Sequence, residues 1–128
     1  MFNLKSLVRP NILALKPYSS ARNEFKGSEG VFLDANENPF GTLNRYPDSY
    51  QKELKDKLSA YKNIPNQNIF IGNGSDEIID LIYRILCNPG VDKALTFTPT
   101  FGMYQVAADI NNIELIKLPL NDDFQVNT

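Results

Sequence analysis

A glycine-containing turn, Gly72-Asn73-Gly74, runs directly into a segment with the pattern of a helix beginning near Ser75. The start of a helix presents backbone N–H groups without intrahelical partners, together with the positive end of the helix dipole. A phosphate group binds well at such a place. An ordinary turn capped by Ser75 has the same pattern, so the spacing leaves both interpretations open. Asp76 and Glu77 support the helix start, but their side chains must point away from any phosphate.

A second candidate for ligand binding is the aromatic residue Phe101, in the segment Pro99-Thr100-Phe101-Gly102-Met103-Tyr104. This segment follows an expected strand at 93–98. Phe101 would therefore lie at the carboxyl end of a parallel strand, where open α/β sheets bind their ligands. Its planar ring can stack on a flat cofactor ring. The alternative is that Phe101 and Tyr104 are core aromatics.

Two polar clusters lie earlier in the chain: Asp34-Ala35-Asn36-Glu37-Asn38-Pro39 and Asn44-Arg45-Tyr46-Pro47. The first follows the apolar group 31–33 and can be read as a plain turn. The second is either the lead-in to a helix or an exposed Arg-Tyr pair. Neither cluster by itself predicts a function.

Hydrophobic periodicity predicts the elements that would position these residues. A helix is expected at 48–61, with Asp48 as N-cap, and a second at 75–87, which has the strongest apolar stripe in the chain. A third, short helix is expected at 102–110. Strands are expected at 68–71, 93–98 and 113–118. Alternation of strands and helices predicts an α/β fold with a mostly parallel sheet.

The chain divides by composition into two parts. Residues 1–48 are rich in proline and glycine, which favours an N-terminal arm of short turns and extended pieces. Residues 49–128 carry the α/β pattern. With so few strands, this second part predicts an incomplete domain with unpaired sheet edges. We therefore expect a fragment of a larger protein or a chain completed by a partner.

Bulk composition excludes several classes of function. Lysine and arginine total 13 and aspartate and glutamate total 15, so the net charge is 13 − 15 = −2, which gives no basic field for a nucleic acid. The absence of histidine and the single cysteine, Cys87, argue against zinc sites, histidine bases and an intrachain disulfide. No apolar run approaches the ~20 residues that cross a bilayer, and the N-terminus lacks a secretory pattern. A cytoplasmic protein is the default expectation.

Taken together and in order, these segments resemble the N-terminal part of histidinol-phosphate aminotransferases, a branch of the fold-type I enzymes that depend on pyridoxal 5′-phosphate (PLP). Asn36-Glu37-Asn38-Pro39 and Gly74-Ser75-Asp76-Glu77 are shared by several related aminotransferases. Leu15-Lys16-Pro17-Tyr18 with Ser20-Ala21-Arg22, and Gly102-Met103-Tyr104, are typical of the histidinol-phosphate branch. The remaining matching segments are Arg9-Pro10-Asn11-Ile12, Leu33-Asp34-Ala35, Asn44-Arg45-Tyr46-Pro47 and Cys87-Asn88-Pro89-Gly90.

The resemblance implies roles for particular residues. The turn at Gly74, with the backbone N–H groups of Ser75 and Asp76, would bind the cofactor phosphate, and Phe101 would stack on the pyridine ring. Relatives often have tyrosine or tryptophan at the stacking position, so a phenolic contact is absent here. Tyr46 would reach the cofactor phosphate of the partner subunit in a homodimer. Tyr18 and Asn36 would lie near the substrate pocket.

The resemblance also implies what these residues lack. The lysine that forms the Schiff base with PLP, an aspartate for the pyridine nitrogen, a tyrosine for the ring oxygen and an arginine for the substrate carboxylate are expected beyond residue 128. Lys93 and Lys117 border strands and are expected to face solvent. We therefore expect no catalytic residue in this segment, and no transaminase activity from it alone.

Three functions remain open from the sequence. In the first, the parent enzyme transfers an amino group between glutamate and imidazole-acetol phosphate in histidine biosynthesis. In the second, a related aminotransferase uses the same cofactor with another acceptor, such as an aromatic keto acid. In the third, the chain is a non-catalytic α/β module that binds a phosphate or a protein partner.

Overall fold

The computed structural model describes residues 3–27 and 29–126. They form two compact units, which we describe separately. The first runs from the start of the chain to Leu15 and from Gly72 onwards, and the second comprises Lys16–Ile71. Within the described ranges no helix combines the length and the apolar character needed to cross a membrane. The expected division into residues 1–48 and 49–128 stays a prediction about the domain organisation.

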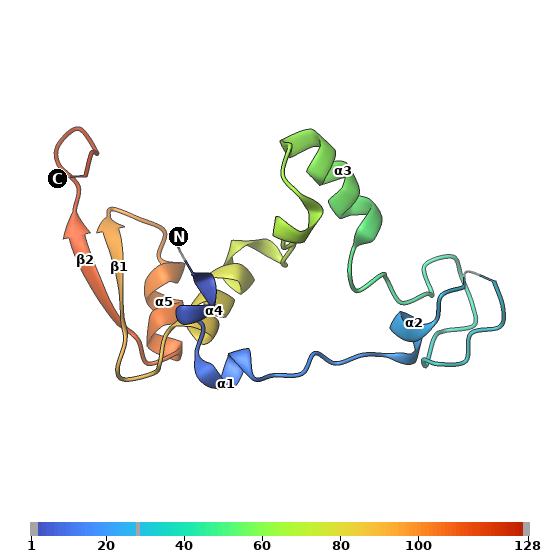
Figure 1. Ribbon diagram of the computed structural model, residues 1–128. Coiled ribbons are helices and arrows are strands. Elements are labelled where there is room, and N and C mark those ends of the chain that lie inside the picture. The colour runs from blue at the N-terminus through green and yellow to red at the C-terminus, as the bar shows by residue number, and fades with distance from the viewer. Residues whose placement is uncertain (1–2, 28, 127–128) are drawn as a thin grey trace. The chain divides into compact units, whose positions relative to one another are not determined.

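The first unit contains a parallel two-stranded sheet with two helices on the same side of it (Figure 1). Helix α4 (Gly74–Leu86) leads to strand β1 (Lys93–Thr98), and helix α5 (Met103–Ile110) leads to strand β2 (Glu114–Pro119). The strands pair in register from Lys93↔Glu114 to Thr98↔Pro119. The expected α/β fold with parallel pairing is thus confirmed, as are both helices and both strands to within one or two residues.

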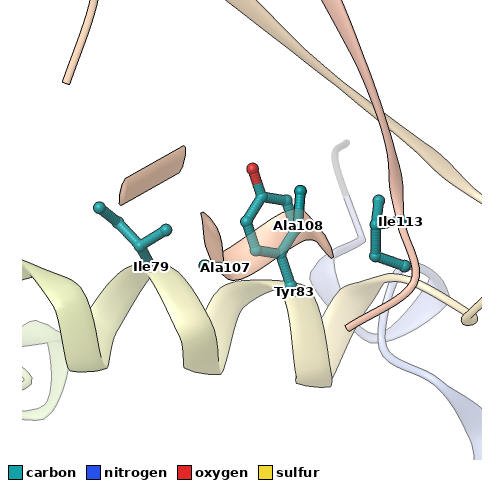
Figure 2. Close-up of a cluster of buried hydrophobic side chains, with 5 residues drawn as sticks. All are labelled: Ile79, Tyr83, Ala107, Ala108 and Ile113. Atoms are coloured by element: carbon teal, nitrogen blue, oxygen red, sulfur yellow. The ribbon is translucent and has the colours of Figure 1, made fainter. Parts of the chain in front are cut away.

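The core of this unit lies where α5 crosses α4. Figure 2 shows Ile79 and Tyr83 of α4 directed toward Ala107 and Ala108 of α5, with Ile113 beside them, just before β2. Ala107 and Ala108 are 2% and 0% exposed, so the α5 backbone comes close to the partner helix at this point. The Tyr83 hydroxyl donates a hydrogen bond to the Tyr104 carbonyl at 3.2 Å, which satisfies the one polar group of this apolar cluster.

The two faces of the sheet differ in their surroundings. Ala94 and Leu115 pack against the core cluster. Side chains alternate between faces along a strand, so the opposite face carries Leu95 and Phe97 of β1 with Ile116 and Leu118 of β2. Leu95 is 52% exposed and Leu118 42% exposed. The described part of the chain therefore covers only one face of this sheet.

The beginning of the arm contacts the end of α4. A short 3₁₀ helix, η1 (Leu4–Ser6), and one helical turn, α1 (Pro10–Leu13), flank Arg9. The Arg9 backbone N–H donates to the Ile85 carbonyl at 3.0 Å, and Arg9 Nη1 donates to the Arg84 carbonyl at 2.8 Å. Carbonyls in the last turn of a helix lack intrahelical donors and carry the negative end of the dipole. The positive guanidinium of Arg9 is attracted to these carbonyls. None of the described residues among the first 30 belongs to a strand of the sheet.

The second unit holds helices α2 (Ala21–Glu24) and α3 (Lys52–Lys62) and the 3₁₀ turn η2 (Asn66–Asn68). Asp48 Oδ1 accepts the Tyr50 N–H at 2.9 Å, and Oδ2 accepts the Lys52 N–H at 2.8 Å. Asp48 thus binds two N–H groups at the entry to the helix, but α3 begins at Lys52 with Gln51 as its N-cap, four residues later than expected, so the expected N-cap position is wrong. The helix ends at Asn63, which adopts the left-handed conformation with φ 54°.

The expected strand at 68–71 is wrong. Asn68 closes η2, and Ile69 has extended dihedral angles (φ −110°, ψ 121°), but residues 69–71 pair with no other strand. A strand is defined by its hydrogen-bonded neighbour, and β1 and β2 are the only paired strands among the described residues. The local pattern predicted the extended conformation and not the pairing.

The packing of α5 on α4 gives a first prediction. Replacement Ala108→Leu adds a branched side chain where the existing one is fully buried, and overpacking of this kind costs about 1–3 kcal/mol of unfolding free energy. The control is Val106→Leu on the same helix, at a side chain that is 45% exposed. Urea unfolding followed by circular dichroism should show a lower midpoint for Ala108→Leu alone, and equal midpoints would contradict this account of the core.

Candidate functional site

The first candidate site is the start of α4, which the glycine turn positions. Gly74 has φ +77°, a conformation that glycine adopts without strain, and its N–H donates to the Gly72 carbonyl at 3.0 Å. The Glu77 carboxylate turns back and accepts the Asn73 N–H. The backbone N–H groups of Ser75 and Asp76 have no acceptor among residues 3–27 and 29–126. Two donors at the positive end of a 13-residue helix are thus available to a ligand.

The space and chemistry at this helix start fit a phosphate monoester. A Cβ placed on Gly74 would meet no atom within 4 Å, so the approach to the backbone is open. Ser75 adds a hydroxyl, which lies 3.4 Å from Asp76 Oδ1. The Glu77 carboxylate lies at the turn itself, where it accepts the Asn73 N–H, so this side chain does not point away from the helix start as expected. The Ser75 and Asp76 N–H groups are thus the donors that this helix start offers to an anion, and its role as the phosphate site stays a prediction.

The second candidate, Phe101, lies between β1 and α5 in the same unit. Its side chain is 53% exposed, whereas Tyr104 packs against the core cluster. The two rings meet edge to face, with centroids 6.3 Å apart and an interplanar angle of 85°. The core interpretation thus applies to Tyr104, while Phe101 presents part of its ring to solvent. That Phe101 lies close enough to the Ser75 turn for one cofactor to touch both stays a prediction.

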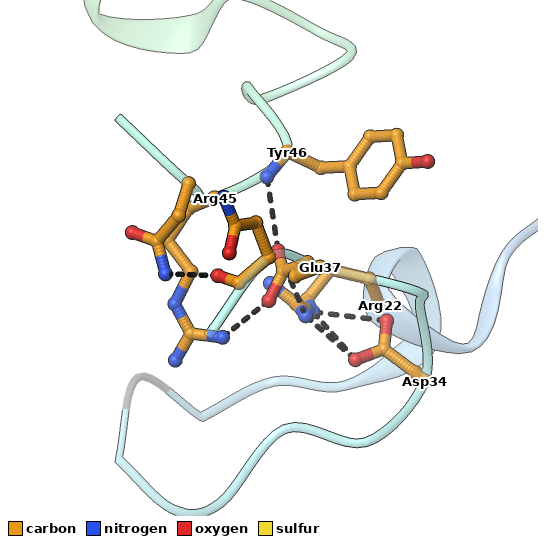
Figure 3. Close-up of polar contacts among 7 residues, drawn as sticks. Arg22, Asp34, Glu37, Arg45 and Tyr46 are labelled. Carbon is orange, nitrogen blue, oxygen red and sulfur yellow. Dashed lines mark hydrogen bonds and ion pairs between the residues drawn. The ribbon is translucent and has the colours of Figure 1, made fainter. Parts of the chain in front are cut away.

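The second unit contains a network of charged groups centred on Glu37 (Figure 3). The Glu37 Oε1 atom accepts the Tyr46 N–H at 2.9 Å, and Oε2 accepts a hydrogen bond from Arg45 Nη1. Arg22 forms a bidentate pair with Asp34, at 3.0 Å from Nε to Oδ2 and 2.6 Å from Nη2 to Oδ1. The Glu37 side chain is only 7% exposed. Three short segments between residues 22 and 46 therefore meet at one carboxylate.

The sequence patterns singled out the segments that contain these residues, but they did not predict that the side chains contact one another. The spacing between Arg22, Asp34 and Glu37 has no local periodicity that would predict a contact. One usable signal was the density of charge in residues 22–45, which hold two arginines, one lysine and four carboxylates in a stretch that otherwise reads as turns. Opposite charges at that density favour ion pairs, but which arginine pairs with which carboxylate depends on the path of the chain between them.

The structure brings some of the expected substrate and cofactor residues together. Asn36 precedes Glu37, which binds the Tyr46 backbone, so these two candidates belong to one local arrangement. Tyr18 belongs to the same unit and is 86% exposed. Gly74, Ser75, Asp76 and Phe101 belong to the other unit. The roles of all these residues stay predictions.

The arginines lower the pKa values of both carboxyl groups. Hydrogen bonds from Arg22 hold the pKa of Asp34 below its ordinary value of 3.8. The Tyr46 N–H, followed by Arg45, holds the pKa of Glu37 below 4.5. Hydrogen bonds to the charged form of an acid favour ionisation. Both carboxylates are therefore ionised at neutral pH, opposite two guanidinium groups.

With this geometry established, comparison with known proteins assigns the class. Residues 19–128 match the family model "Aminotransferase class I and II", and the chain belongs to that family. It is 54% identical over 128 residues to a histidinol-phosphate aminotransferase of Parabacteroides distasonis, covering 99% of this chain and 37% of the relative.

Two further relatives carry the same name. A histidinol-phosphate aminotransferase of Christiangramia forsetii is 58% identical over 127 residues, covering 97% of this chain and 36% of the relative. One of Cytophaga hutchinsonii is 53% identical over 131 residues, covering 98% of this chain and 38% of the relative. The chain thus spans just over a third of the length of these curated relatives.

The network around Glu37 gives a prediction about pH. A carboxyl group whose pKa is lowered in the folded state stabilises that state above its ordinary pKa, and the contribution is lost as the pH falls through the lowered value. Carbon-detected NMR titration should place the midpoint of Asp34 below 3.8 and that of Glu37 below 4.5. The same titration in urea should return both to their ordinary values, and equal midpoints in the two states would contradict the network.

Proposed function

We propose that these residues are the N-terminal part of a histidinol-phosphate aminotransferase, which moves an amino group between glutamate and imidazole-acetol phosphate in histidine biosynthesis. The observation that carries the proposal is identity of 53–58% to proteins of that name over nearly the whole chain. The phosphate-binding chemistry of the α4 start supports it. The enzyme is a cytoplasmic homodimer that uses PLP.

In this proposal the chain contributes the binding of the cofactor and not the chemical step. The N–H groups of Ser75 and Asp76 bind the cofactor phosphate at the helix start, and the open space at Gly74 admits it. Phe101 lies against one face of the pyridine ring and excludes water from it. The Tyr46 hydroxyl donates a hydrogen bond to the cofactor phosphate of the partner subunit.

Other residues of the chain act on the substrate. Tyr18 and Asn36 border the substrate pocket, where a phenol and an amide can orient a polar acceptor. PLP, when bound, supplies the electron sink for amino transfer. The residues that move protons during transfer are expected beyond residue 128, so the 128-residue chain by itself is inactive.

The proposed reaction is tested with the complete protein that carries this chain. Purified protein with PLP, glutamate and imidazole-acetol phosphate should release 2-oxoglutarate, measured by a coupled dehydrogenase assay. Replacement of the acceptor by phenylpyruvate should lower kcat/KM by at least about a hundredfold, because a site that pairs with a phosphate rejects an acceptor without one. A preference for phenylpyruvate would assign the aromatic branch instead, and turnover by residues 1–128 alone would contradict the division of roles.

The phosphate site is tested by removing one donor. Replacement Ser75→Pro deletes the backbone N–H in the first helical turn, where proline is tolerated, and the preceding glycine reduces the restriction on the residue before proline. Because hydrogen bonds to charged groups are the strong ones, PLP affinity should fall by about tenfold or more. The control Ser75→Ala keeps the N–H and should lose less PLP affinity. Fluorescence titration of the apoprotein with PLP measures the affinity of both variants, and equal losses would show that the hydroxyl and not the backbone binds phosphate.

A further inference from the structure

The Glu37 carboxylate has no capacity left for a ligand. Its Oε1 atom accepts the Tyr46 N–H at 2.9 Å and lies 3.9 Å from Arg22 Nη2, while Oε2 binds Arg45. The side chain is 7% exposed. A carboxylate with both oxygens engaged and almost no solvent contact does not act as a base or a metal ligand.

The arginines around Glu37 are each paired with a carboxylate, although the Arg22 side chain is 34% exposed and the Arg45 side chain 55% exposed. Arg22 donates three hydrogen bonds to Asp34, and its guanidinium lies 4.3 Å from the centroid of the Phe32 ring. Arg45 lies 5.8 Å from the same ring. Stacking on an aromatic face orients a guanidinium and reduces its freedom. Phe32 is itself held edge to face by Phe25 at 5.6 Å.

The charges of this network cancel. Arg22 and Arg45 carry two positive charges, and Asp34 and Glu37 carry two negative charges at neutral pH. A neutral, internally paired cluster attracts no anion, which distinguishes it from a phosphate-binding arginine cluster. Its effect must therefore be on the position of the chain segments that it joins.

Tyr46 is the residue that the network binds by its backbone while its side chain stays exposed. Its backbone N–H is bound to Glu37, while its ring points away from the charged groups with its hydroxyl at the far end (Figure 3). The side chain is 63% exposed. A phenol on a fixed backbone is a directed donor for an anionic ligand, because part of the entropy of ordering it has already been lost on folding.

We infer that Glu37 is a positioning residue that fixes Tyr46 for contact with a phosphate monoester, with Arg22, Asp34 and Arg45 holding the carboxylate in place. This inference rests on the proposed function for the identity of the ligand. The fixed backbone at Tyr46 does not depend on it.

The inference is tested by a double-mutant cycle on PLP affinity in the complete protein. Glu37→Ala and Tyr46→Phe should each weaken binding by about tenfold, the effect of losing one hydrogen bond to a charged group. If Glu37 acts through Tyr46, the double variant should also be about tenfold weaker and not about a hundredfold. Glu53→Ala, at an exposed glutamate of α3 in the same unit, is the matched control and should bind as the wild type does.

A second measurement does not require the cofactor. Amide hydrogen exchange of the peptide that contains Tyr46 should accelerate in Glu37→Ala and not in Glu53→Ala, because the acceptor of the Tyr46 N–H has been removed. Glu37→Gln keeps an oxygen for this N–H but loses the charge that pairs with the arginines, so its effect should be smaller. If Glu37→Ala does not fold, the cycle and the exchange measurement with Glu37→Gln decide the question.

The outcomes separate the two proposals. Three results would each overturn the positioning role and leave the aminotransferase proposal intact. The first is a double variant whose loss of affinity is the product of the two single losses. The others are an unchanged affinity in Tyr46→Phe and unchanged exchange at Tyr46 in the Glu37 variants. A wild-type protein that binds no PLP would overturn the proposed function. In that case accelerated exchange at Tyr46 would still support the role of Glu37 in fixing the backbone.

Discussion

The close approach of α5 to α4 organises the first unit, and it depends on two side chains of minimal size. Ala107 and Ala108 leave room for Tyr83 to lie across the contact and to satisfy its hydroxyl on the Tyr104 carbonyl. Protein interiors are close-packed, so even a small change in the size of these side chains would move one helix relative to the other. Because α4 starts at the glycine turn and α5 follows Phe101, this contact sets the directions of both elements that carry the candidate cofactor residues.

The second unit is organised by charge and not by apolar burial. No side chain of residues 16–22, 24–27 and 29–71 is fully buried, and the Glu37 carboxylate is only 7% exposed. Ion pairs exposed to solvent contribute little to stability. Pairs that share a nearly buried carboxylate and an aromatic ring instead restrict the geometry of the segments that they join. The network thus suits a segment whose function is to present side chains.

The candidate site residues are exposed to an extent unusual for an enzyme core. Tyr18, Tyr46 and Phe101 are more than half exposed, and one apolar face of the sheet is uncovered in the described part of the chain. Large exposed apolar surfaces mark places where other protein surfaces pack. In the proposed homodimeric aminotransferase, spanning about three times this length, both the sheet face and the arm have surfaces to pack against.

The sequence by itself determined the family, helices α4 and α5, strands β1 and β2, and the glycine turn that begins α4. These features are encoded by neighbours in the chain: periodicity, capping residues and turn glycines act over a few residues. Tertiary structure alone decided that residues 69–71 remain unpaired, that Arg9 binds the end of α4, and that Glu37 binds the Tyr46 backbone. Each of these depends on a hydrogen-bond partner brought close by the fold, and a pattern within a short stretch of sequence carries no record of that partner.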